Sequence, residues 1–159
     1  MGLCSQHGPT SHETSQMPRA QRTIVIDRPA DQVFAFFTNP RNDPMRRPHL
    51  KKIAAQGPAG RGSTIRQVVE GPGGRAIPAD IQVTVSEPPS RYAFKVTTGP
   101  VRPVGEFQFA PAGNGTEVIF SLHADLGGIK KLLMSRPMQN SMDGEMAALD
   151  KVKALLETA

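Results

Sequence analysis

The chain has 159 residues, of which 38% are hydrophobic and 21% are charged, and its formal net charge is +5. These values are typical of one globular domain with a single core. No apolar run approaches the roughly 20 residues of a membrane-spanning helix, which excludes an integral membrane protein of the helical kind. Met1–Ala20 lacks the apolar core of a secretory signal, and Cys4 is the only cysteine, so we expect a cytoplasmic protein.

Residues 1–20 are expected to form a flexible leader, because Ser, Thr, Gln, His, Gly and Pro dominate them and offer little apolar surface. Met17 is an alternative start. Cys4, His7 and His12 could hold a metal ion, but a zinc site normally needs four fixed ligands, so an unstructured tail is the preferred interpretation. Residues 21–159 are expected to form a single domain, and no metal site or cofactor is predicted.

The first half of this domain alternates between β-branched and apolar-periodic segments. Gln21–Asp27 is predicted to be a strand, and the phenylalanines of Asp31–Thr38 give the following helix a broad apolar face. Asn39–Pro40 ends that helix, and Arg41–Pro48 is predicted to form a second short helical turn. Six further strands follow between turns rich in Gly and Pro: Leu50–Ala55, Ser63–Glu70, Ala76–Ser86, Arg91–Thr97, Arg102–Ala110 and Thr116–Ala124. Short strands joined by short turns predict an antiparallel sheet with one apolar face.

The last segment, Ile129–Leu156, is the only stretch long enough for a major helix. Its apolar stripe recurs every three or four residues at Met138, Met142, Met146, Leu149, Val152 and Leu156. Pro137 lies inside the pattern and predicts a kink or break, with a long helix after it. The methionines fit either ordinary core or an adaptable wall that contacts a ligand.

The order of these elements, together with the turns that separate them, resembles that of a known superfamily. The residues that carry the resemblance are Ile24–Val25–Ile26, Arg28–Pro29–Ala30–Asp31–Gln32–Val33–Phe34, Thr38–Asn39–Pro40, Gly62–Ser63–Thr64, Ser86–Glu87–Pro88–Pro89–Ser90–Arg91 and Gly113–Asn114–Gly115–Thr116. In this order and spacing they resemble the START/Bet v 1-like (SRPBCC) superfamily, and within it the polyketide cyclase/dehydrase-like proteins. The resemblance covers nearly all of residues 21–157.

The resemblance implies an α+β helix-grip fold, in which a curved antiparallel sheet of about seven strands wraps a long C-terminal helix around an apolar cavity. Members of the superfamily bind lipids, sterols, polyketides or other metabolites, and some catalyse cyclisation or dehydration, so the fold does not fix the function. Many relatives carry a tryptophan soon after the Asn-Pro corner. This chain has no tryptophan and reads Asp43–Pro44–Met45–Arg46–Arg47 there, and Met45 could fill the space.

Strand alternation and the last helix together predict which side chains line the cavity. The predicted set is Phe37, Met45, Ile65, Gln67, Ile81, Tyr92, Phe94, Phe107, Phe120, Met134, Met138 and Met142. On the strands only Gln67 and Tyr92 offer hydrogen-bonding side chains, and Tyr92 could donate to a carbonyl. Asp80, Glu106 and His123 lie at the alternate strand positions, whose side chains point to the other face of the sheet, and are expected to face solvent. No catalytic motif such as G-x-S-x-G, H-E-x-x-H or C-x-x-C is present, so no catalytic residue is assigned.

The cations of the chain are concentrated between Arg41 and Arg66. Seven of them (Arg41, Arg46, Arg47, Lys51, Lys52, Arg61, Arg66) stand against Asp43, which gives 7 − 1 = +6. A solvated surface is the preferred interpretation. Attraction of an anionic ligand or membrane surface to the cavity mouth is a second, and nucleic-acid binding ranks last because no aromatic residues are interleaved.

The leading prediction is a protein that binds a hydrophobic or amphipathic small molecule, such as a lipid, polyketide or aromatic metabolite, between the sheet and the long helix. A polyketide cyclase or dehydratase is the enzymatic alternative, and a protein-interaction module is the third. Nucleic acid is not an expected partner, and the chain is expected to be a monomer or homodimer.

Overall fold

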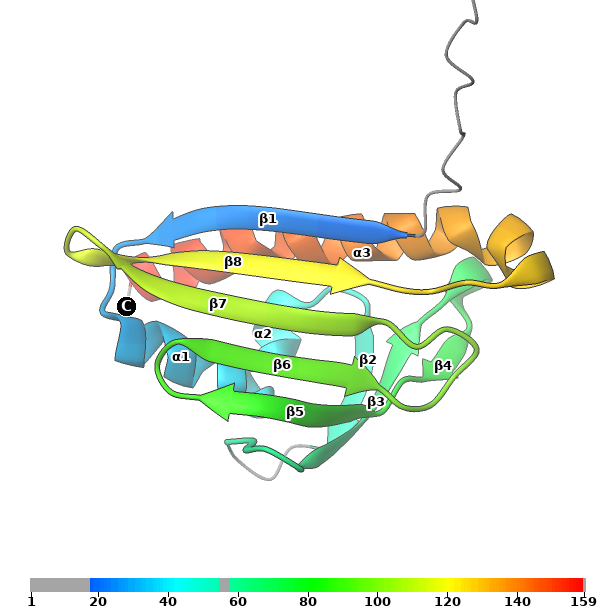
Figure 1. Cartoon of the computed structure of the whole chain (residues 1–159), viewed down its shortest axis with the longest axis horizontal. Coiled ribbons are helices and arrows are strands. Elements are labelled where there is room, and N and C mark those ends of the chain that lie inside the picture. The colour runs from blue at the N-terminus through cyan, green and yellow to red at the C-terminus, as the bar shows by residue number, and fades with distance from the viewer. Residues whose placement is uncertain (1–17, 55–57, 159) are drawn as a thin grey trace, which may run out of the picture.

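A computed structural model describes residues 18–54 and 58–158 as one sheet packed against helices (Figure 1). The elements are β1 (Arg19–Ile26), α1 (Ala30–Thr38), the short 3-10 helix η1 (Pro40–Asn42), α2 (Asp43–Arg46), β2 (Leu50–Ala54), β3 (Thr64–Glu70), the 3-10 helix η2 (Pro72–Gly74), β4 (Ala76–Pro78), β5 (Ile81–Glu87), β6 (Arg91–Val96), β7 (Val104–Ala112), β8 (Gly115–His123) and α3 (Gly128–Glu157). The predicted order of strand, short helices, strands and long helix is confirmed.

The strands form an antiparallel sheet in the order β1-β8-β7-β6-β5-β3-β2, with β4 paired to β3. The first strand therefore lies beside the last, with Arg19 opposite His123 and Ile26 opposite Thr116. Helix α3 runs behind β1 and β8, while α1 and α2 lie behind the middle of the sheet (Figure 1). This arrangement is the predicted helix-grip fold.

The predicted strand Ala76–Ser86 is two strands in the structure, β4 and β5. The break falls at Ala79 and Asp80, directly after Pro78, which has no N–H to donate to a ladder. β4 continues the hairpin with the second half of β3, whereas β5 pairs with the start of β3 at Thr64 and Ile65. The change of partner falls at a corner of the sheet that borders the cavity described below, since Ile65, Ile77 and Ile81 line it.

The sequence predicts a kink or break at Pro137, and the break does not occur, because α3 is one helix of 30 residues with Pro137 inside it. Proline cannot donate to the carbonyl four residues earlier, which belongs to Leu133. The Leu133 side chain is 68% exposed, so water can reach the freed carbonyl. The exposed position of Leu133 therefore lets the helix accommodate the proline.

The hydrophobic core lies between the concave face of the sheet and the helices. Leu149 and Val152 on α3 are fully buried against inward-facing residues of β1 and β8 such as Ile26 and Val118. Each such side chain contributes about 1.5–3 kcal/mol by leaving water. Side chains of α3 also occupy the free edge of β1: Lys153 Nζ donates to the Val25 carbonyl at 2.6 Å, and Glu157 Oε1 accepts from the Asp27 N–H at 2.9 Å. The edge strand is thereby shielded from pairing with another chain.

Strand β1 begins at Arg19, two residues inside the region expected to be a leader. The rest of that expectation, together with Met17 and the candidate ligands Cys4, His7 and His12, lies outside the described residues. None of the helices within 18–54 and 58–158 is long and apolar enough to cross a membrane.

Candidate ligand-binding cavity

A cavity of about 550 Å³ lies between the concave face of the sheet, α2 and the first half of α3. At one end of the sheet it is bordered by the β3–β4 turn, the β6–β7 loop and the N-terminal half of α3, which lie close together in Figure 1. Most of its wall is apolar. At the α2 end the wall carries charged and amide side chains.

Ten of the twelve residues in the predicted set line this cavity: Ile65, Gln67, Ile81, Tyr92, Phe94, Phe107, Phe120, Met134, Met138 and Met142. Strand alternation places the seven residues from β3 and β5 to β8 there, because every second side chain faces α3. Their contact with a ligand stays a prediction.

The other two residues of the predicted set lie elsewhere. Phe37 is 3% exposed and packs behind the wall, with its ring centroid 4.9 Å from that of Phe107. Met45 is 45% exposed and does not line the cavity. Consecutive residues of a helical turn point about 100° apart, and the inward position belongs to its neighbour Arg46, which is 5% exposed.

Gly105 on β7 shapes the wall opposite Phe94 on β6, because the two residues are directly paired across the strands. A Cβ at position 105 would lie 2.3 Å from Phe94 Cζ and 2.9 Å from Leu122 Cδ2. Only glycine leaves room for the Phe94 ring to lie over the backbone of β7.

Along α3 the cavity wall gives way to core after Glu145. Met134, Pro137, Met138 and Met142 line the cavity, and Glu145 is the last residue of the helix to do so. Met146 is buried but belongs to the core below the cavity. The change therefore falls between Glu145 and Met146.

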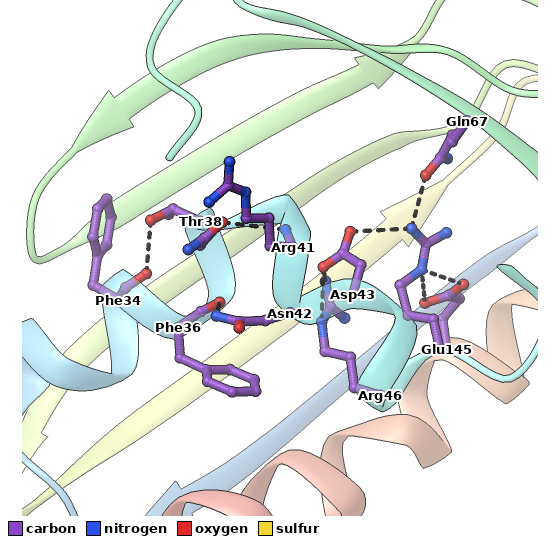
Figure 2. A network of polar contacts seen from close by, with 11 residues as sticks. Phe34, Phe36, Thr38, Arg41, Asn42, Asp43, Arg46, Gln67 and Glu145 are labelled. Carbon is purple, nitrogen blue, oxygen red and sulfur yellow. Dashed lines mark hydrogen bonds and ion pairs between the residues drawn. The ribbon is translucent and has the colours of Figure 1, made fainter. Parts of the chain in front are cut away.

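The charged end of the cavity is a connected group that we call the polar cluster: Asp43, Arg46, Arg47, Gln67 and Glu145. Arg47 Nε donates to both carboxylate oxygens of Glu145, at 3.0 and 3.1 Å, and its Nη1 donates to Gln67 Oε1 at 2.9 Å and Asp43 Oδ2 at 3.3 Å. Arg46 donates to Asp43 Oδ1 through Nη2 at 2.8 Å and Nε at 3.2 Å. Figure 2 shows Asp43 of α2, Gln67 of β3 and Glu145 of α3 around one guanidinium group, which belongs to Arg47.

Local hydrogen bonds fix the segment that presents the polar cluster. Thr38 Oγ1 donates to the Phe34 carbonyl at 2.9 Å, and Asn42 Nδ2 donates to the Phe36 carbonyl at 3.0 Å (Figure 2). Asn39 Oδ1 accepts from the Arg41 N–H at 3.2 Å and so caps the start of η1. These side chains close the end of α1 and set the direction in which α2 begins.

The charges of the polar cluster balance, with two carboxylates against two guanidinium groups. Burial alone would lower the pKa of Arg47, but the charges and hydrogen bonds of Glu145 and Asp43 outweigh it and hold that pKa above its ordinary value. The Arg46 guanidinium carbon lies 5.4 Å from the ring centroid of Phe37 and 6.0 Å from that of Phe107, within cation–π range. The two cations are thus held between acids and aromatic faces.

Among the uncharged donors of the cavity wall, the Tyr92 hydroxyl and the Gln67 amide nitrogen have no hydrogen-bond partner in the part of the chain that the structure describes. Tyr92 is 5% exposed and Gln67 4% exposed. In the described part of the chain no fully enclosed side-chain nitrogen or oxygen lacks a partner, so both donors must open onto the cavity. Burial, with a smaller contribution from Asp43, raises the pKa of Tyr92 to about 12, so its hydroxyl stays protonated at neutral pH.

Sequence reasoning missed the polar cluster. Of the seven cations between Arg41 and Arg66, Arg46 and Arg47 lie in the cavity wall, so the solvated-surface prediction is wrong for these two. It is correct for the other five, which are exposed: Arg41, Lys51, Lys52, Arg61 and Arg66. The spacing of Asp43 from Arg46 and Arg47, three and four residues, was the available signal for an ion-paired turn.

Besides Glu70 at the end of β3, the wall contains one further titratable group that sequence reasoning did not place there, His49. It lines the cavity beside α3, where a Cβ on Gly144 would lie 3.1 Å from its Nε2. Glu106 and His123 lie outside the wall as predicted, and Glu106 pairs with Arg91 at 3.1 Å. Asp80 is half-buried and accepts from the Gln67 N–H at 3.2 Å. Within the described residues no group of three or more His, Cys, Asp or Glu side chains could hold a metal ion.

A family model described as "Polyketide cyclase / dehydrase and lipid transport" matches residues 17–157, which includes every element of the fold. The chain belongs to this family. No curated protein matches it.

Solved structures similar to this family member share its fold. A START superfamily protein from Mycobacterium smegmatis has a TM-score of 0.70 and 14% identity, covering 88% of this chain and 97% of that one. Protein DR_A0006 from Deinococcus radiodurans has a TM-score of 0.66 and 21% identity, covering 88% of this chain and 98% of that one. Ara h 8.0201 has a TM-score of 0.67 and 10% identity, covering 89% and 98%. At these identities the likeness shows the fold alone.

Proposed function

We propose that this protein binds one hydrophobic or amphipathic small molecule in the cavity between the sheet and α3. The observation that carries the proposal is the cavity itself: about 550 Å³ of space walled by aromatic, aliphatic and methionine side chains, with polar groups gathered at one end. A few polar groups in an otherwise apolar pocket orient a ligand, while the apolar wall supplies most of the affinity. Membership of a family that includes lipid transport is consistent with this role.

A cyclase or dehydratase reaction is the second candidate, and His49 is the observation that favours it. His49 and Tyr92 line the same cavity. An imidazole can take a proton from carbon next to a carbonyl while a phenol donates to the carbonyl oxygen. Loss of turnover of a poly-β-ketone substrate in His49→Gln, with binding retained, would favour the enzyme over the binding protein.

The remaining expectations stay predictions. They are a cytoplasmic location, a monomeric or homodimeric state, no nucleic-acid partner, and the protein-interaction module as a third alternative. The outer face of the sheet or the exposed cations of residues 41–66 would have to carry such an interaction.

Native mass spectrometry of the gently purified chain tests the binding function. We expect an extra mass of one small molecule per chain, and saturable one-to-one binding of the neutral probe N-phenylnaphthylamine. Ala79→Phe, which places a ring in the cavity wall, is expected to abolish both. Ala110→Phe on the exposed face of β7 is the matched control and should retain both. A wild-type chain that carries no adduct and binds no probe would overturn the proposal.

A further inference from the structure

The polar end of the cavity offers donors to a ligand, whereas its carboxylate and Gln67 amide oxygens already accept hydrogen bonds. The free donors include the Tyr92 hydroxyl and the Gln67 amide nitrogen, together with Arg46 Nη1 and Arg47 Nη2, because the two arginines donate through their other nitrogens. The Gln67 amide oxygen accepts from Arg47, and the carboxylate oxygens of Asp43 and Glu145 accept from the two arginines. This end of the cavity therefore favours a ligand group that accepts hydrogen bonds.

The charges in the wall decide which acceptor is favoured. Three carboxylates (Asp43, Glu70, Glu145) and two guanidinium groups (Arg46, Arg47) line the cavity, so the wall has no surplus positive charge. Both guanidinium groups are ion-paired. A carboxylate ligand would lose its hydration without gaining an unpaired cation as a partner. Burying a charge without such a partner costs free energy. A neutral oxygen has a much smaller hydration free energy to lose.

We propose that the cavity selects ligands that present a neutral carbonyl, such as a ketone or ester, to the Tyr92 hydroxyl at the α2 end, with the hydrocarbon body along the methionine face of α3. This inference rests on the proposed function and adds the chemical class of the ligand. An amine is disfavoured at the α2 end as well, because Asp43 and Glu145 are already occupied by Arg46 and Arg47 and the third carboxylate, Glu70, is exposed at the end of β3.

The raised pKa of Tyr92 fits this role. Because the pKa is about 12, the phenol keeps its proton throughout the physiological range and can act as a donor. The hydroxyl is held in place by its ring, which lies edge-on to Phe34 with a centroid separation of 6.4 Å. The donor is thus pre-positioned before the ligand enters, and no side-chain ordering opposes binding.

Competition with bound N-phenylnaphthylamine tests the class of ligand on the full chain. Nonanone, nonanoate and nonylamine share a nine-carbon chain and differ in the polar group. At neutral pH we expect nonanone to displace the probe at a concentration at least ten-fold lower than either charged analogue. In Tyr92→Phe the affinity for nonanone should fall about five-fold relative to the affinity for the probe, the typical effect of one net hydrogen bond. Thr23→Val removes an exposed hydroxyl from β1 and should change neither affinity.

The outcomes separate the inference from the function on which it rests. Equal or better displacement by nonanoate would overturn the inference in favour of an anion site. Unchanged nonanone affinity in Tyr92→Phe would overturn it as well. In both cases the proposed function stands, because the probe still binds. If the wild-type chain does not bind the probe, the proposed function fails, and the inference fails with it.

Infrared spectroscopy gives a second readout that a merely structural role of Tyr92 would not produce. The carbonyl stretch of carbon-13-labelled nonanone should shift to lower frequency on binding to the wild-type chain, as expected for a carbonyl that accepts a hydrogen bond. The shift should be absent or smaller in the Tyr92→Phe complex. An identical stretch in the two complexes would contradict the assigned contact.

Discussion

Arg47 and Glu145 lie 98 residues apart in the sequence, yet the Arg47 Nε contacts both carboxylate oxygens of Glu145. Their side chains are 10% and 16% exposed. This pair joins the end of α2 to α3 at the place where the wall of the cavity changes to the core of the domain. The two segments that close the cavity are therefore held together by a largely buried ion pair.

Breaking this pair from one side is expected to destabilise the fold. Arg47→Met should lower the free energy of unfolding by about 3 kcal/mol, because Glu145 then remains desolvated without its cation. The double variant Arg47→Met/Glu145→Leu should lose less than the sum of the two single variants, with a coupling free energy of at least about 1 kcal/mol. Urea unfolding at neutral pH measures the free energy of unfolding of the wild type, the two single variants and the double variant.

The exposed pair Arg22–Asp150 is the control for this cycle. Asp150 is 64% exposed and Arg22 34% exposed at the side chain, so solvent screens their interaction. Arg22→Met should therefore shift the urea midpoint much less than Arg47→Met. Equal shifts in the two variants would show that burial of the Arg47 pair has no energetic consequence.

Gly105 is expected to be necessary for the shape of the cavity wall. Gly105→Ala introduces a Cβ that overlaps the Phe94 ring, and either the ring or the β6–β7 pair has to move. Such overpacking costs about 1–3 kcal/mol, and displacement of Phe94 into the cavity should weaken probe binding. Thermal unfolding and probe titration measure the two effects.

Gly60→Ala supplies the comparison for Gly105→Ala, since nothing lies within 4 Å of the Cβ that it would introduce. Its stability is expected to stay within about 0.5 kcal/mol of the wild type. If Gly105→Ala were as mild as Gly60→Ala, the close approach of Phe94 to β7 would not be a constraint on this wall.

Tyr92 is the only tyrosine of the chain, so its ionisation can be followed without ambiguity by the absorbance of tyrosinate. The midpoint should lie near pH 12, against 10.0 for an exposed tyrosine, because burial disfavours the charged form. A midpoint near 10 would mean that the hydroxyl is solvated and not a buried donor.

The same shift predicts a pH dependence of stability. Below pH 10 the phenol is protonated in both the folded and the unfolded chain, and the contribution is constant. Between pH 10 and about 12 the unfolded chain releases the proton while the folded chain keeps it, so the free energy of unfolding falls as pH rises. The wild type should therefore lose about 1.4 kcal/mol per pH unit more than Tyr92→Phe in this range.

Local pattern was enough to predict the apolar wall. Alternation in β6 places Tyr92 and Phe94 on the same face of the sheet. The three-to-four-residue spacing in α3 places Met138 and Met142 on the same face of the helix, and both faces line the cavity. Both rules depend only on the repeat of the element. They hold wherever the element itself is predicted correctly.

The polar end could not be predicted in the same way. Whether Met45 or Arg46 points inward depends on the direction in which a single helical turn begins, and hydrogen bonds of Thr38, Asn39 and Asn42 set that direction. The partner of Arg47, Glu145, comes from a distant helix, and hydrophobicity favours neither residue for a buried site. Only the packed fold shows that their charges compensate each other.

The methyl groups of the methionines give the most direct test of the cavity as a binding site. In a chain labelled with carbon-13 at these methyls and saturated with N-phenylnaphthylamine, nuclear Overhauser effects should connect the aromatic protons of the probe to Met134, Met138 and Met142, which line the cavity. Met45, exposed on α2, and Met146, buried below the cavity, should show none. Contacts confined to Met45, or none to the three cavity methionines, would contradict binding between the sheet and α3.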